Sequence, residues 1–167
     1  VCEELPAELA EVISKSNYFY NFTGGAFNIS VKPLLDLYQS SFKEGSQPTP
    51  AAISRALEFV DGDVVRMHEN SVSLVKNGMG ITLDGIAKGY IVDKVSELLL
   101  ENGVENHLIN AGGDIRANGT AAKGRKWKIA IQNPNKERAY PDVVSLGSGS
   151  IATSGNYEIY YDKEKVF

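Results

Sequence analysis

The chain has 167 residues, of which 43% are hydrophobic and 23% charged, so it has the composition of one globular domain rather than of a disordered chain. Its net charge of −4 offers no basic surface for nucleic acid, and no stretch approaches the roughly 18 apolar residues of a membrane span. Cys2 is the only cysteine, which excludes an internal disulfide and a cysteine metal cluster.

Three segments have the apolar spacing and the end signals of helices. The first covers residues 6–16. In the second, Thr49 is the expected N-cap and Pro50 the first helical residue. The third, residues 86–102, is the most strongly marked and ends at Asn102-Gly103. Its apolar face consists of Ile91, Val95, Leu98 and Leu99.

Alternating apolar residues between turn signals predict strands. The predicted strands lie near residues 64–69, 72–75, 81–83, 106–110, 114–118, 127–132, 142–147 and 156–161. Phe27, Ile29 and Val31 also alternate, up to Pro33, and residues 39–48 are predicted to be a loop. This order of elements predicts an α+β fold, a single domain with a largely antiparallel sheet and helices packed on one side.

Four segments place glycine or small residues beside polar residues at the ends of predicted elements. They are TGGAFN (23–28), LDGIAKGY (83–90), NAGGDI (110–115) and IATSGNY (151–157). Because glycine lacks a Cβ, a ligand or another backbone can approach it closely. One such segment is usually only a turn. Four of them in one domain indicate a ligand site.

Lys88 and Asp114 each allow two interpretations. The Lys88 ammonium and the free N–H groups at the start of its helix would suit phosphate oxygens, although the P-loop and GxGxxG spacings are absent. A solvated lysine in the first turn is the equal alternative. Asp114 could bind a ligand, or it could be a turn residue that accepts hydrogen bonds from nearby N–H groups.

The remaining polar and aromatic side chains favour structural roles or a non-hydrolytic site. Thr153 and Ser154 are adjacent hydroxyls with no histidine and acid placed to activate them, so a serine hydrolase is not expected. The residues predicted to have structural roles are His68, His107, Trp127, Tyr157 and Tyr160.

In this order the segments resemble the ApbE family of FAD:protein FMN transferases. TGGAFNISVKPLLDLY is similar to that family's TGGAFDITVGPL, and LDGIAKGYIVDKV is similar to GGIAKGYAVDRV. LINAGGDIRANG, WKIAIQNP and SIATSGNYE resemble NxGGDIRxxG, WxVGIxxP and AVATSGxYE. The resemblance covers nearly the whole chain and implies an ApbE-like, T-fold-like domain.

The resemblance implies transfer of FMN from FAD to a Ser or Thr hydroxyl of an acceptor protein, with release of AMP. Mg²⁺ would neutralise the pyrophosphate, with the carbonyl of Ala87 as one metal ligand and with Lys88 near the pyrophosphate. Thr153 and Ser154 would line the flavin pocket. The implied flavin-nucleotide site consists of Asp84, Gly85, Ala87, Lys88, Gly112, Gly113, Asp114, Ala152, Thr153 and Ser154.

The chain also departs from the family. Asn28 stands where the family usually has Asp, and aligning GIAKG puts Asp84 on a common Gly and Thr82 on a common Asp. Family members are roughly twice as long as this chain, which is more than one ordinary domain. We therefore expect a truncated, central part of such an enzyme, with the family's functional histidine and further magnesium ligands after Phe167. The catalytic residue is unknown within this chain.

The resemblance also implies a location and leaves other functions open. Family members are typically extracytoplasmic and often lipid-anchored, but Cys2 is a poor candidate for the anchor because matching residues follow it directly. The alternatives are a non-catalytic flavin-binding module and a structural α+β domain without ligand; SGSIAT (148–153) only loosely resembles an acceptor motif. A truncated domain would leave an apolar face uncovered, which predicts self-association.

Overall fold

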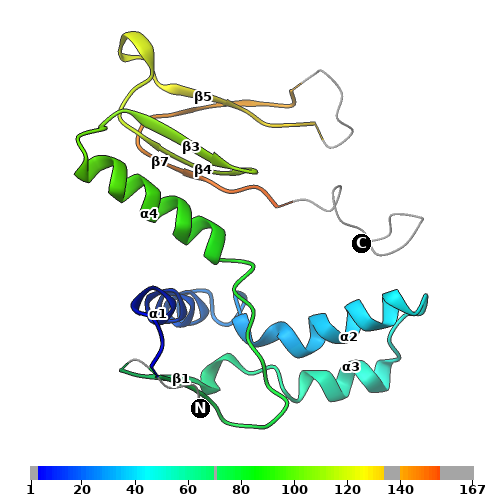
Figure 1. The fold of residues 1–167 in the computed structure, drawn as a ribbon. Coiled ribbons are helices and arrows are strands. Elements are labelled where there is room, and N and C mark those ends of the chain that lie inside the picture. Colours follow the sequence, from blue (N-terminus) through cyan, green and yellow to red (C-terminus); the bar gives the residue numbers. More distant parts are fainter. Residues whose placement is uncertain (1–3, 70, 134–139, 155–167) are drawn as a thin grey trace. The chain divides into compact units, whose positions relative to one another are not determined.

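The computed structural model describes residues 4–69, 71–133 and 140–154 (Figure 1). The chain divides into two compact units, Val1–Ala87 and Lys88–Phe167. The single domain expected from the sequence stays a prediction. The predicted strand at 156–161 lies outside the described residues, as do Tyr157 and Tyr160.

In the first unit, helices precede a β-hairpin. The helices are α1 (Ala7–Phe22), α2 (Lys32–Lys43) and α3 (Pro50–Leu57), with 3-10 turns at Ile29–Val31 and Gly62–Val64. Figure 1 shows α2 and α3 side by side, as their mutual contacts require. The hairpin pairs β1 (Val65–His68) with β2 (Ser71–Leu74) antiparallel, as the apolar pattern predicts.

The core of the first unit lies between α1, the hairpin and the turn before α2. Its buried residues are Leu5, Ile13, Ile29, Val65 and Val72. Half-buried apolar side chains pack around them, among them Leu9 and Phe27. The core therefore holds the segment that begins TGGAFN against the hairpin.

Thr49 caps α3 as the sequence predicts. Its Oγ1 accepts a hydrogen bond from the Ala52 N–H at 3.2 Å, and Pro50 opens the helix. This cap satisfies one of the N–H groups that have no partner inside the helix.

The alternation of Phe27, Ile29 and Val31 does not produce a strand. Ile29–Val31 is a 3-10 turn, and α2 follows at once with Pro33 in its first turn. Proline is accepted there because the first N–H groups of a helix have no intrahelical partner. The predicted loop at 39–48 accordingly begins only after α2 ends.

The strand predicted near 81–83 is also wrong. The Thr82 N–H donates to the carbonyl of Ile29 at 2.8 Å, which ties this segment to the turn before α2. Within the described residues it forms no ladder with another strand.

The second unit combines one long helix with short antiparallel strands. The elements are α4 (Ala87–Glu101), β3 (His107–Ala111), β4 (Asp114–Asn118), β5 (Trp127–Ala130), β6 (Val143–Leu146) and β7 (Gly149–Ile151). The described strands form a β3-β4-β7 sheet and a β5-β6 sheet, all antiparallel. The predicted α+β class is confirmed, with separate small sheets in place of one. The short strand β7 was not predicted.

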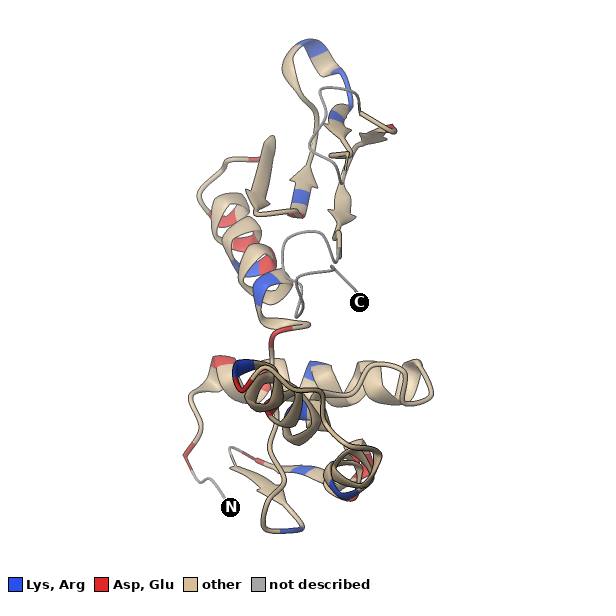
Figure 2. Ribbon diagram, turned by 90° about the vertical axis from the view of Figure 1, so that its right-hand side faces the viewer, with Lys and Arg blue, Asp and Glu red and all other residues tan. Residues whose placement is uncertain are grey.

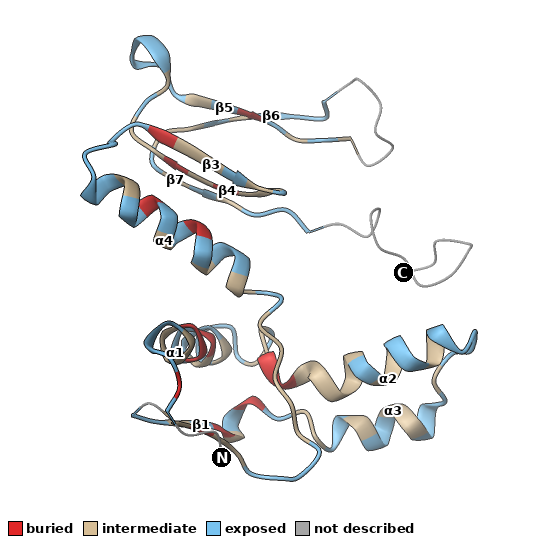
Figure 3. Cartoon of the chain, in the orientation of Figure 1, coloured by how far each residue is buried: buried red, intermediate tan, exposed pale blue. Residues whose placement is uncertain are grey.

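Helix α4 leaves most of its predicted apolar face exposed, although Leu99 is half-buried. Its buried residues are Val92 and Ser96, whereas Ile91 is 59% and Leu98 58% exposed (Figure 3). The polar pairs that join α4 to the strands are Lys88 with Asp114, Asp93 with Arg116, and Ser96 with His107. The self-association expected from an uncovered apolar face stays a prediction.

The hydroxyl of Tyr20 should ionise only at unusually high pH. Desolvation raises its pKa above the ordinary 10.0, and the charges of Asp63 and Asp61 and a hydrogen bond with Asp63 raise it further. A raised folded-state pKa contributes stability that is fully present below the unfolded pKa and is lost as pH rises through the folded pKa. The pH dependence of tyrosinate absorbance, compared between the chain and its Tyr20→Phe variant, measures the pKa of Tyr20.

The control for Tyr20 is Asp63→Asn, which removes the larger of the two charge effects and should lower the Tyr20 pKa. The absorbance of the unmodified chain minus that of Tyr20→Phe gives the titration of Tyr20 alone. A midpoint at or below pH 10 would contradict the expected rise of its pKa.

Candidate functional site

Within the first unit, the first glycine segment contacts the start of the second. Gly24 and Gly25 leave α1 with positive φ angles of +60° and +86°. The Thr23 Oγ1 accepts a hydrogen bond from the Phe27 N–H at 2.9 Å, which folds the segment back. A Cβ at Gly85 would lie 3.3 Å from the Phe27 ring. Glycine at this point allows the second segment to pack closely on the first.

Asn28 caps the turn that positions α2. Its Oδ1 accepts from the Ser30 N–H at 2.9 Å and from the Ser30 hydroxyl at 2.7 Å, and Ser30 is fully buried. An aspartate would offer the same acceptor. The departure from the family's usual Asp therefore removes a charge but keeps both hydrogen bonds.

We expect Asn28→Asp to leave the free energy of unfolding within about 0.5 kcal/mol, because a carboxylate accepts both bonds and suits the start of a helix. Asn28→Ala should lower it by about 1–2 kcal/mol, since the cap is lost. Urea unfolding measures both. Equal destabilisation by Asp and Ala would show that the amide nitrogen, not the oxygen, is what the turn requires.

Asp84, Gly85 and Ala87 lie at the entrance to α4. Asp84 and Gly85 are exposed, and the Asp84 N–H donates to the Thr82 Oγ1 at 3.2 Å. The Ala87 N–H donates to the Leu83 carbonyl at 2.8 Å. The side chain of Asp84 is thus available to a ligand in solvent.

The third and fourth segments meet in the second unit. Gly112 and Gly113 form the tip of the β3-β4 hairpin with φ of +64° and +99°. The Asn110 Oδ1 accepts from the Gly113 N–H at 3.1 Å, and the Thr153 hydroxyl donates to the Gly113 carbonyl at 3.4 Å. A Cβ at Gly113 would lie 2.7 Å from the Thr153 Oγ1, so only glycine allows this approach.

A cavity of about 840 Å³ opens beside this contact. Gly112, Gly113, Thr153 and Ser154 form its polar wall. Isoleucines from both sheets form its apolar wall: Ile115, Ile129, Ile131 and Ile151. A cavity of this volume, with apolar side chains and several polar groups in its wall, is within the size range of small-molecule and cofactor sites.

Sequence reasoning did not find the isoleucine wall or the role of Asn110. Ile115 and Ile129 belong to strands of different sheets, and their period-two alternation marks only a buried face. Only the arrangement of the two sheets in space shows that these faces share one cavity. Ala152, predicted as a site residue, is exposed and does not line it.

Lys88 and Asp114 form an ion pair in the second unit. The Lys88 Nζ lies 3.2 Å from the Asp114 Oδ2, with 54% and 17% of the two side chains exposed. The capping of the hairpin turn, one of the two roles considered for Asp114, belongs to Asn110. Asp114 thus holds a cation that is still largely open to solvent.

The described residues fit a magnesium ion only in part. Residues 4–69, 71–133 and 140–154 contain no group of three or more His, Cys, Asp or Glu side chains that could hold a metal. Magnesium takes oxygen ligands, usually with one or two carboxylates. The Ala87 carbonyl lies in the first turn of α4, where a second lone pair remains for another partner.

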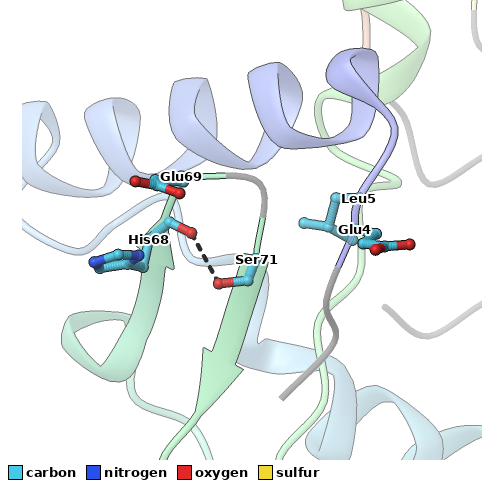
Figure 4. A pocket seen from close by; sticks show the side chains of 5 residues that line it. All are labelled: Glu4, Leu5, His68, Glu69 and Ser71. Carbon is cyan, nitrogen blue, oxygen red and sulfur yellow. Dashed lines mark hydrogen bonds between the residues drawn. The ribbon is translucent and has the colours of Figure 1, made fainter.

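The two histidines have the structural positions expected of them. His68 is exposed at the end of β1, where its carbonyl accepts from the Ser71 hydroxyl at 2.8 Å beside a small open pocket (Figure 4). His107 starts β3 and is only 6% exposed.

The fold and the cavity define an α+β protein with a cofactor-sized site walled by glycine turns, hydroxyl groups and isoleucine side chains. The chain belongs to the ApbE family, whose sequence profile matches residues 2–167.

Named relatives support this assignment. The chain is 31% identical to the FAD:protein FMN transferase of Haemophilus influenzae, over 96% of this chain and 49% of that protein. It resembles the crystal structure of the ApbE protein of Thermotoga maritima with a TM-score of 0.85 and 32% identity, over 98% of this chain and 54% of the other. The flavin transferase ApbE of Vibrio cholerae matches with a TM-score of 0.77 and 26% identity, over 94% and 53%.

The chain spans about half the length of the curated relatives that it matches. In the described part of the chain, no helix is both long and apolar enough to cross a bilayer.

Proposed function

We propose that the protein to which this chain belongs is a FAD:protein FMN transferase. It would move FMN from FAD to a Ser or Thr hydroxyl of an acceptor protein and release AMP. Membership of the ApbE family and the names of the matching relatives support the reaction. The observation that supports it most directly within the chain is the contact of Gly113 with Thr153 beside the cavity.

In this proposal the second unit binds part of the flavin nucleotide. The isoleucine wall would cover the apolar face of the ring system, while the hydroxyls of Thr153 and Ser154 would bond to its polar edge. Gly112 and Gly113 would let the ligand approach the backbone. Lys88 would contribute positive charge to the pyrophosphate.

The transfer itself is a substitution at phosphorus. The acceptor oxygen bonds to the phosphorus of the FMN half, the bond to the AMP oxygen breaks, and the hydroxyl proton passes to a base. Such reactions depend mainly on positioning and charge stabilisation. Among the described residues we assign no catalytic base.

We also propose that Asp84 and Gly85 contact the flavin nucleotide and that the Ala87 carbonyl is one ligand of Mg²⁺. Magnesium, when bound, would neutralise pyrophosphate charge. Isothermal titration of Mg²⁺ into the chain with and without FAD tests this. Binding that needs FAD is expected, because the described residues supply only part of a ligand set.

A location outside the cytoplasm and a lipid anchor in the parent protein are further proposals, supported only by the resemblance to the family. Fractionation of cells that express the full gene, with labelling of attached lipid, tests both. Recovery of unlipidated protein in the cytoplasm would contradict them.

The reaction is tested with FAD, Mg²⁺ and an acceptor peptide. A flavin transferase adds the mass of one FMN to the peptide and releases an equal amount of AMP. The second candidate function is a flavin-binding module without catalysis, for which the cavity beside Gly113 and Thr153 would suffice. Flavin binding without transfer in the full-length protein would support that module and contradict the enzyme.

A further inference from the structure

Helix α4 contacts the β3-β4-β7 sheet through polar pairs. Beyond the pair of Lys88 with Asp114, the Arg116 Nε lies 3.8 Å from the Asp93 Oδ1. The Ser96 Oγ lies 2.7 Å from the His107 Nε2. Figure 2 shows acidic and basic positions along the helix, and Val92 is the one apolar residue among those of α4 described as buried.

The innermost pair has a defined hydrogen-bond direction. The His107 Nδ1 lies 2.8 Å from the Val104 carbonyl, which can only accept, so Nδ1 carries a proton. In the neutral ring Nε2 is then an acceptor, and the Ser96 hydroxyl donates to it. Ser96 is 2% and His107 6% exposed, so water cannot replace either bond.

This pair lies on the same side of α4 as Lys88. Residues 88, 92 and 96 follow one another at intervals of four and so share one face. The separation of eight residues corresponds to about 12 Å along the helix. On this face the directional bond of Ser96 to His107 and the ion pair of Lys88 with Asp114 restrict the rotation of α4 about its axis.

We propose that Ser96 and His107 are positioning residues that set the rotation of α4 and thereby hold Lys88 against Asp114, facing the diphosphate of the bound dinucleotide. This inference rests on the proposed function. Arg116 lies at the same contact, with its Nε 3.8 Å from the Asp93 Oδ1 of α4 and its Nη1 donating to the Ser150 hydroxyl of β7 at 3.1 Å.

The test compares two ligands that differ in phosphate. Flavin fluorescence gives the Kd of the full chain for FAD and for riboflavin, which has no diphosphate. Lys88→Met should raise the Kd for FAD at least fivefold and change the Kd for riboflavin by less than twofold. Ser96→Ala should have the same selective effect, and the double variant should be no worse than either single one. A structural defect alone would weaken both ligands equally.

Ser96→Cys keeps the buried volume with a weaker donor, and it replaces Ser96→Ala if that variant does not fold. Leu98→Ala, at an exposed position of the same helix, is the control and should leave the ratio of the Kd for FAD to the Kd for riboflavin unchanged. If Lys88→Met selectively weakens FAD binding but the Ser96 variants do not, the positioning role of Ser96 and His107 is overturned, while the role of Lys88 remains. Failure of the full-length parent protein to bind either flavin overturns the proposed function and, with it, this inference.

Discussion

Alanine at Gly113 should lower the free energy of unfolding by about 2–3 kcal/mol and weaken flavin binding by about tenfold or more. The residue has φ of +99°, which strains any side chain, and its new Cβ would lie 2.7 Å from the Thr153 Oγ1. The hydroxyl must then move away from the hairpin tip and from the cavity wall. Denaturant unfolding and flavin fluorescence measure the two effects.

Gly112→Ala is the matched control. It shares the left-handed backbone, with φ of +64°, but its Cβ would meet nothing within 4 Å. We expect only the conformational penalty of about 1 kcal/mol in the free energy of unfolding. Thr153→Ala combined with Gly113→Ala should recover the part of the stability lost to the collision. Equal losses for the two single variants would mean that the contact with Thr153 has no role.

Alanine at Gly119 should destabilise the chain by about 3 kcal/mol or more. Gly119 follows β4 with φ of +64°, and a Cβ would collide with the Asn106 side chain and lie 2.9 Å from the Glu105 carbonyl. The backbone at Glu105 cannot rotate away, because its carbonyl also accepts from the Asn118 side chain at 2.7 Å. Thermal unfolding measures the loss.

Gly124→Ala is the control for Gly119. It lies in the following turn with φ of +69° and nothing within 4 Å of the added Cβ, so about 1 kcal/mol is expected. A loss at Gly119 no larger than at Gly124 would contradict the close approach of β4 and the segment before β3.

Elements with local end signals could be predicted from the sequence. Thr49 and Pro50 define the start of α3, and the glycine that follows α4 at residue 103 marks its end with φ of +77°. The hairpin β1-β2 follows from apolar alternation around a short turn. In these cases residues close in sequence make the contacts that decide the structure.

Long-range contacts account for most of what the sequence did not predict. The alternation of Ile29 and Val31 was outweighed by the Asn28 cap and by a bond from Thr82, far along the chain. The packing side of α4 depends on His107 and Arg116, which the helix sequence does not contain. The ion pair of Lys88 with Asp114 likewise could not be predicted without the geometry of the β3-β4 hairpin.

The candidate site was predicted as residue types but not as a cavity. The glycine and hydroxyl patterns mark Gly113 and Thr153 as candidate site residues, and the two residues are in contact. The family resemblance, not the spacing, related them to a flavin. The four isoleucines remained hidden because burial alone does not distinguish a ligand wall from a core.

The hydrogen bonds of His107 also make it a natural spectroscopic reporter. An imidazole proton on Nδ1 that is held by the Val104 carbonyl and shielded from water should exchange slowly with solvent. Its loss to deuterium requires this local bond to open and water to reach the ring, so the exchange rate of this single proton measures how often that happens. Because the Ser96 hydroxyl of α4 covers the other ring nitrogen, one side chain would report the local opening of the contact between α4 and β3.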